Sequence, residues 1–107
     1  MPQYLIQASY TAGAWANMIK NPQDRIQVVA RSIEKPGGKV LHGWLAFGEY
    51  DTISVIEMPD NASAAAFAMA ISAAGACKSV KTTPPLSQED GLAAAKKATT
   101  SGYQPPA

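Results

Sequence analysis

Residues 43–60 read GWLAFGEYDTISVIEMPD, and this stretch decides the fold of the chain. Two runs of alternating apolar and polar residues flank a short turn, a pattern typical of a β-hairpin. We expect the turn at Gly48-Glu49, where Gly48 can adopt a positive φ. The later strand of the hairpin, residues 51–58, is the third strand of the chain and ends at Pro59, and Asp60 or Asn61 can cap a following helix. The stretch therefore places a hairpin and a helix start at the centre of a small α+β fold.

The residues before the hairpin predict a strand and a helix in two pieces. Residues 4–10 alternate and are rich in β-formers, so we expect a strand there, followed by Thr11 as a helix N-cap. Asn21-Pro22 interrupts the helix, because proline lacks the N–H donor and restricts the residue before it. We expect Asn21 to cap the second piece, residues 36–38 to end it, and residues 40–47 to form the second strand.

The residues after the hairpin predict a helix, a strand and a further short helix. The helix from Asp60 to Ala74 is rich in alanine, which leaves a smooth surface that can approach a sheet closely. Gly75 is a natural helix stop, and residues 77–83 form the fourth strand. A short helix then follows over residues 87–98, with an acidic first turn and a basic last turn that suit the helix dipole.

The resulting order, β-α-β-β-α-β, is that of a ferredoxin-like α+β fold. It predicts a four-stranded antiparallel sheet with helices on one face and an extra C-terminal helix. We assign residues 1–86 to this domain and residues 87–107 to the C-terminal helix with a flexible, proline-containing tail. The core elements leave the other face of the sheet uncovered.

Composition narrows the class of protein. A chain of 107 residues is long enough for one domain with one core. Its net charge of +1 is too small to attract nucleic acid or anionic membrane surfaces by a general electrostatic field. No apolar run approaches the roughly 18 residues of a membrane span, and the N-terminus lacks the basic region of a signal peptide. Cys77 is the single cysteine, so no intrachain disulfide can form. We expect a cytoplasmic protein with no nucleic-acid or membrane partner.

Strand alternation divides the sheet residues between two faces. The expected helix-facing set is Tyr4, Ile6, Ala8, Leu41, Leu45, Phe47, Ile53, Val55 and Val80. The expected open-face set is Leu5, Gln7, Ser9, His42, Trp44, Ala46, Thr52, Ser54 and Ile56. A solvated face would carry more Lys and Glu, whereas a dry interface would carry more Val and Leu. The mixture predicts a face-to-face homodimer that leaves a ligand pocket between the two sheets.

His42 and Trp44 are the main candidate site residues on that open face. His42 is the only histidine and the one candidate catalytic group, because imidazole can act as acid, base or ligand near neutral pH. Nothing nearby completes a catalytic pair or a metal site, which favours a structural role. Trp44 could stack on a planar ligand or anchor a subunit interface. Gln7, Ser9 and Ser54 complete the predicted lining of this pocket.

Tyr50 and Asp51 follow the turn and are the remaining candidates. Asp51 can accept hydrogen bonds from turn amides, which favours a structural role. In the alternative, Tyr50 and Asp51 form a pair at the mouth of the pocket and the carboxylate holds a substrate donor. Cys77 lacks a partner such as a CxxC motif and is interpreted as structural. The sequence predicts no metal and no cofactor.

The same residues carry a resemblance to a known family. The FGEYD turn at 47–51, the EMPD strand exit at 57–60, Tyr4-Leu5, Tyr10-Thr11, Gly13 and the alanine-rich helix ending at Ala74-Gly75 resemble the GYD-domain family. The resemblance covers roughly residues 3 to 84. It implies a dimeric α+β barrel, a superfamily of cofactor-independent monooxygenases, haem-dependent enzymes and stress or binding proteins.

Three functions remain open from the sequence. The first is a homodimer, or a higher oligomer, that binds a small planar or apolar molecule between its sheet faces. The second is a cofactor-independent monooxygenase or isomerase that acts on an aromatic substrate with help from His42. The third is a structural or partner-binding oligomer without a ligand. Fold resemblance alone does not choose among them.

Overall fold

A computed structural model describes the whole chain, residues 1–107. The elements in chain order are β1 (Gln3–Tyr10), α1 (Ala12–Lys20), α2 (Arg25–Glu34), β2 (Lys39–Leu45), β3 (Thr52–Glu57), α3 (Asn61–Ala74), β4 (Cys77–Thr83) and α4 (Gln88–Ala98). The four strands form one sheet in the order β2-β3-β1-β4, with every neighbouring pair antiparallel. This is the predicted ferredoxin-like arrangement.

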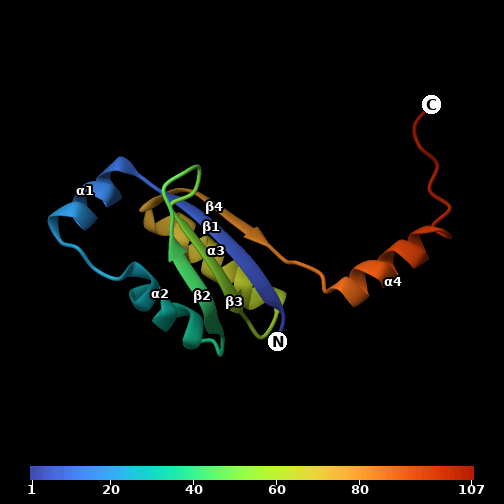
Figure 1. Cartoon of the computed structure of the whole chain (residues 1–107), viewed down its shortest axis with the longest axis horizontal. Helices are drawn as coiled ribbons and strands as arrows, with labels where there is room; N and C mark the ends of the chain where they lie inside the picture. Colours follow the sequence, from blue (N-terminus) through green and yellow to red (C-terminus); the bar gives the residue numbers. More distant parts are fainter.

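The helices cover one face of the sheet. In the view of Figure 1 the strands lie in front of α3, and α2 lies beside the outer strand β2. α3 packs mainly against β4, and α2 packs mainly against β2. The two covering helices therefore lie towards opposite edges of the sheet, and the opposite face has no helix of its own.

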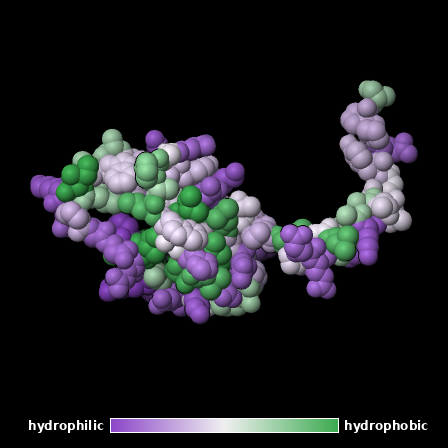
Figure 2. Space-filling view, viewed as in Figure 1, coloured by the Kyte–Doolittle hydropathy of each residue, from purple (hydrophilic) through white to green (hydrophobic).

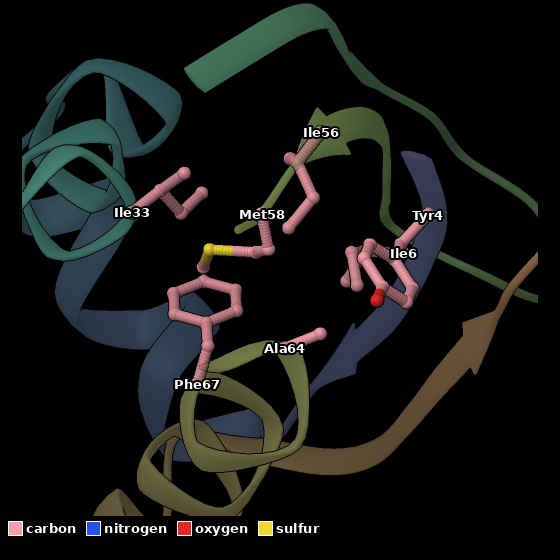
Figure 3. Close-up of a cluster of buried hydrophobic side chains, with 7 residues drawn as sticks. All are labelled: Tyr4, Ile6, Ile33, Ile56, Met58, Ala64 and Phe67. Atoms are coloured by element: carbon pink, nitrogen blue, oxygen red, sulfur yellow. The ribbon is translucent and has the colours of Figure 1, made fainter. Parts of the chain in front are cut away.

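The main core lies between these two helices and the end of the sheet where β1 begins and β3 ends. Its buried members are Tyr4, Ile6, Ile33, Ile56, Met58, Ala64 and Phe67. Figure 3 shows Met58 between Ile33 of α2 and Phe67 of α3, so its flexible side chain joins both helices to the sheet. Ile56 and Met58 are fully buried.

Strand β3 has the opposite alternation from the one predicted. Ile56 pairs with Tyr4, and Ser54 pairs with Ile6, so these β3 residues face the helices. Thr52 joins them opposite Ala8, whereas Ile53 and Val55 lie on the open face. The prediction placed Ile53 and Val55 in the core and was wrong. Pairing with β1 sets Ile56 opposite Tyr4, on the face that the helices cover, so Ile53 and Val55 point to the other face.

Two irregularities adjust the outer strands. Val40 pairs with Ile56 and His42 pairs with Val55, so Leu41 is an extra residue in β2. This bulge turns Val40 towards the helices and His42 towards the open face, which corrects the placement of Leu41 among the helix-facing residues. On the other edge the register shifts between Ser9 and Tyr10, which brings Tyr10 opposite Cys77.

Most helix ends follow the predicted caps. The Thr11 side chain accepts a hydrogen bond from the Ala14 N–H, and the Asp60 carboxylate accepts one from the Ser63 N–H. Gly75 ends α3 at φ 80°, a left-handed conformation that favours glycine. The cap of α2 is Asp24 instead of the predicted Asn21, because its carboxylate accepts from the Gln27 N–H and the helix begins after it.

The hairpin loop is longer than predicted. β2 ends at Leu45 and β3 begins at Thr52, so Phe47 lies outside the strand and is fully exposed. The backbone at Gly48 does not adopt the positive φ expected of it. The predicted two-residue turn at Gly48-Glu49 is therefore part of a wider loop.

The C-terminal helix stands apart from the body. Figure 1 shows α4 on an extended connection that leads away from β4, and no residue of α4 is buried. The chain consequently measures 57 × 36 × 22 Å. The assignment of residues 87–107 to a separate segment stays a prediction. None of the helices has both the length and the apolar character needed to cross a membrane.

Candidate functional site

A cavity of about 270 Å³ lies between the sheet and the two covering helices, beside the main core. Its floor is made by helix-facing sheet residues, including Ala8, Thr52 and Ser54, and its sides by α2 and α3. Most of the lining is apolar. Binding sites for small molecules are commonly concave and apolar with a few polar groups, so this cavity is the first candidate site.

Small residues explain why the space stays open. The row across this part of the sheet pairs Ala8 with Thr52, and the neighbouring row pairs Ile6 with Ser54. Ala70 and Ala74 line the cavity from α3. The side chains of Ala8, Thr52 and Ser54 are smaller than those of Tyr4 and Ile56 in the main core. They therefore leave space between the sheet and the helices.

The wall of the cavity that α2 forms comes close to the sheet at Gly43 of β2. A Cβ added there would lie 2.6 Å from the Ile26 side chain of α2, so the glycine lets α2 approach β2. Ile26 is thereby held against the sheet and forms part of the cavity wall. The absence of a side chain at residue 43 thus positions one side of the cavity.

Three chemically active side chains line one end of the cavity. They are Tyr10 at the end of β1, Arg25 at the start of α2 and Cys77 at the start of β4. Burial raises the pKa of the Tyr10 hydroxyl, and the Arg25 guanidinium partly opposes this shift. Burial also raises the pKa of the Cys77 thiol, again opposed by Arg25. Tyrosine and cysteine are therefore neutral at pH 7, and Arg25 is the one charged residue of the lining.

A second cavity of about 430 Å³ lies beside the first, under α1 and the α1–α2 connection. Arg25, Ile26 and Thr52 line both cavities. The second one has a more polar lining that includes Gln23 and Asp24. The first cavity is smaller but has the largely apolar walls expected of a ligand site.

The open face of the sheet carries a second candidate surface. Two rows cross it from β2 to β1, one formed by His42, Val55 and Leu5, and the other by Trp44, Ile53 and Gln7. The rings of His42 and Trp44 are stacked with their centroids 5.5 Å apart and an angle of 11° between their planes. Trp44 is 51 % exposed. Figure 2 has the same viewpoint as Figure 1 and shows hydrophobic residues gathered over the sheet.

The hairpin loop joins β1, α1 and β3 through Asp51. The Asp51 Oδ2 atom accepts hydrogen bonds from the Tyr10 N–H at 2.8 Å and the Trp15 Nε1–H at 3.3 Å. The Ser9 hydroxyl donates to the Glu49 carbonyl at 2.8 Å, which buries Ser9 under the loop. Tyr10 and Trp15 also meet edge to face with centroids 5.4 Å apart. Asp51 thus has a structural role as a clamp.

The predicted site residues are distributed over three places. Gln7, His42 and Trp44 lie on the open face, Ser54 lines the cavity on the other side of the sheet, and the remaining three are Ser9, Tyr50 and Asp51, in or beneath the hairpin loop. Ser54 and the His42–Trp44 pair therefore cannot line one pocket within a single copy. Neither of the two cavities is lined by His42 or Trp44.

Sequence reasoning did not select Tyr10, Arg25 or Thr52 as site residues. Tyr10 lies at the end of a strand face that points to the helices, which was a usable signal. Arg25 carries no such signal, because only the packing of α2 on β2 brings it to the cavity. No group of three or more His, Cys, Asp or Glu side chains lies close enough together to hold a metal ion.

Comparisons with known proteins agree with the fold. A family model described as GYD domain matches residues 4–95, and so reaches into α4, past residue 84 where the resemblance was expected to end. The crystal structure of FFRP-DM1 is 17% identical and superposes with a TM-score of 0.54, over 80% of this chain and 100% of that chain.

The hypothetical protein PHS023 from Pyrococcus horikoshii is 18% identical and has a TM-score of 0.53, over 82% of this chain and 93% of that chain. At such identities these two likenesses concern the fold alone. No curated protein matches the sequence.

Proposed function

This chain belongs to the GYD-domain family, and we propose that it is a homodimer that binds a small, largely apolar molecule between its sheet and its helices. The cavity of about 270 Å³ carries the proposal. Its volume is close to the lower end of the range for small-molecule sites, roughly 300 Å³. A ligand of the size of a small aromatic compound or a medium-length alkyl chain suits this space.

The open face supports the homodimer. The centre of this face holds Leu5, Ile53 and Val55, flanked by the half-exposed Trp44. A sheet face in contact with water normally carries polar side chains. Contiguous exposed apolar groups commonly mark an interaction site. A second copy offers the same apolar face in a two-fold arrangement, in which each surface complements itself.

The reversed alternation of β3 moves the proposed ligand site away from the open face. With Ile53 and Val55 there in place of Thr52 and Ser54, the open face suits a drier interface than the sequence predicted. The polar hydroxyls of Thr52 and Ser54 line the cavity on the helix side. We therefore place the ligand in that cavity and assign Trp44 to the subunit interface.

The two other functions receive less support. A monooxygenase or isomerase that uses His42 would need a pocket on the open face, on the far side of the sheet from the cavity. A purely structural oligomer would have no use for an apolar cavity beside its core. The cavity favours binding as the function, with the dimer as the form in which the protein acts.

Light scattering at micromolar concentration tests the dimer. We expect the mass of two chains, because the open face is an extended apolar surface without a helix over it. A clean monomer at that concentration would remove this half of the proposal.

Isothermal calorimetry with two neutral probes, naphthalenemethanol and octanol, tests the cavity. We expect saturable binding that weakens by about tenfold in Ala70→Leu, because the larger side chain enters the lined space. The matched control is Ala73→Leu, at an exposed position of the same helix outside the lining. Equal effects of the two substitutions would overturn the cavity as the site, and so would a failure to bind of both alcohols and of the corresponding acids, naphthoate and octanoate.

A further inference from the structure

Arg25 is the one charged side chain that lines the cavity, and it has no ion-pair partner. The single ion pair of the structure joins the N-terminal amine to Glu57 at 3.9 Å, far from Arg25 in the chain. The guanidinium lies beside the Tyr10 hydroxyl and donates a long hydrogen bond of 3.5 Å from Nη1 to the exposed Gln23 Oε1. Most of its five N–H donors are therefore free for a ligand.

The nearby carboxylates are occupied with other donors. Asp51 accepts from the Tyr10 N–H and the Trp15 Nε1–H, and Asp24 caps α2 by accepting from the Gln27 N–H. Neither forms an ion pair with Arg25. The positive charge at this end of the cavity is therefore not neutralised by the protein.

On the premise that the cavity is the binding site proposed above, we infer that its ligand is a monocarboxylic acid with an apolar body. The guanidinium of Arg25 binds the carboxylate, and the body lies among Ile26, Phe67 and Ile71. A planar guanidinium matches a carboxylate with two parallel hydrogen bonds. The Tyr10 hydroxyl lines the same end and is neutral at pH 7, so it can donate to a carboxylate oxygen.

Charge balance selects the carboxylate among anions. One guanidinium neutralises one negative charge, whereas a phosphate monoester carries nearly two at pH 7. No second cation lines the cavity. Since a buried charge without a partner is costly, a dianion would be bound less well than a singly charged carboxylate with the same body.

The test compares acids with neutral alcohols of the same shape. Calorimetry near pH 7 measures naphthoate against naphthalenemethanol and octanoate against octanol. We expect each acid to bind about tenfold or more tightly than its alcohol, as a charged hydrogen-bonded pair implies. Arg25→Gln should remove that difference, so that each acid binds no more tightly than its alcohol. Arg25→Lys should retain part of it, because lysine keeps the charge but loses the planar fork.

The control is Arg31→Gln, which removes an exposed arginine of the same helix that does not line the cavity. It should leave all four dissociation constants unchanged. If acid and alcohol bind equally to the unmodified protein, or if Arg25→Gln weakens both to the same extent, the carboxylate inference is wrong while the cavity stands. If none of the four compounds binds, the cavity proposal itself is overturned, and the inference with it.

Discussion

Alternate residues of β3 point to opposite faces of the sheet, and the two faces are completed in different ways. Ile56 is enclosed by the protein's own helices together with Met58 and Phe67. Its neighbour Val55 lies on the open face beside His42, where no element of the same chain covers it. Both residues are β-branched and apolar. Their surroundings differ because of register, so the intrinsic hydrophobicity of a strand residue does not decide which face it joins.

The first prediction measures this difference directly. Ile56→Ala should lower the free energy of unfolding by about 3 kcal/mol, because a fully buried aliphatic side chain leaves a cavity in the core. Val55→Ala should cost about 1 kcal/mol or less within a single chain. Urea denaturation of both variants in the Trp44→Asp background, which the next prediction expects to be monomeric, measures the two losses. Equal losses would show that the open face is as tightly packed as the core.

The second prediction concerns what completes the open face. Trp44→Asp should convert the proposed dimer to a monomer at micromolar concentration, because a central aromatic anchor commonly contributes about 2 kcal/mol or more to an interface. Light scattering measures the mass. The control is Leu45→Asp, which changes the next residue along β2, also exposed but on the helix side of the sheet. A dimer that survives Trp44→Asp would place the interface elsewhere.

The third prediction concerns the hairpin loop between β2 and β3, in which Asp51 bonds to Tyr10 of β1 and Trp15 of α1. Asp51→Ala should destabilise the fold by about 2 kcal/mol, because hydrogen bonds from Tyr10 and Trp15 lose a charged acceptor. Thermal or urea unfolding measures the loss. Glu49→Gln in the same loop should have little effect, since only the Glu49 backbone carbonyl is used. A comparable loss in both variants would mean that the loop is held by its shape and not by Asp51.

The fourth and smallest effect depends on pH. Burial raises the pKa of Tyr10 above its usual value of 10.0, so the folded state favours the neutral phenol. The associated stabilisation is fully present below the unfolded pKa and is lost as pH rises through the folded pKa. Tyr10→Phe should therefore flatten the fall in unfolding free energy above about pH 10. Tyr103→Phe, in the exposed tail, should leave that slope unchanged.

Local patterns in the sequence predicted most of the fold. Thr11 and Asp60 cap the helices that they were expected to cap, and Gly75 ends α3 in a left-handed conformation. These features depend on a few neighbouring residues, so the sequence contains the information. Asn21 failed as a cap because Asp24, three residues later, offers a carboxylate to the N–H groups of α2. Two cap residues so close together cannot be ranked without the position of the helix.

The candidate site was less accessible to sequence reasoning. The His42–Trp44 pair was correctly placed on the open face, and its stacking agrees with the two-residue spacing. Ser54 was assigned to the same face but lies on the other, because the phase of β3 follows from its pairing with β1. Arg25 reaches the cavity only through the packing of α2 against Gly43. The ligand roles of these residues stay predictions.

The sequence by itself determined the family, the order of the elements and the ends of most helices, because caps, breakers and alternation act over a few residues. Tertiary structure alone decided the phase of β3, the bulge at Leu41 and the cavity that Arg25 and Ser54 share. Those features depend on which strands pair and how closely helices approach the sheet. Such contacts are made between residues that are far apart in the chain, so a pattern of neighbouring residues does not reveal them.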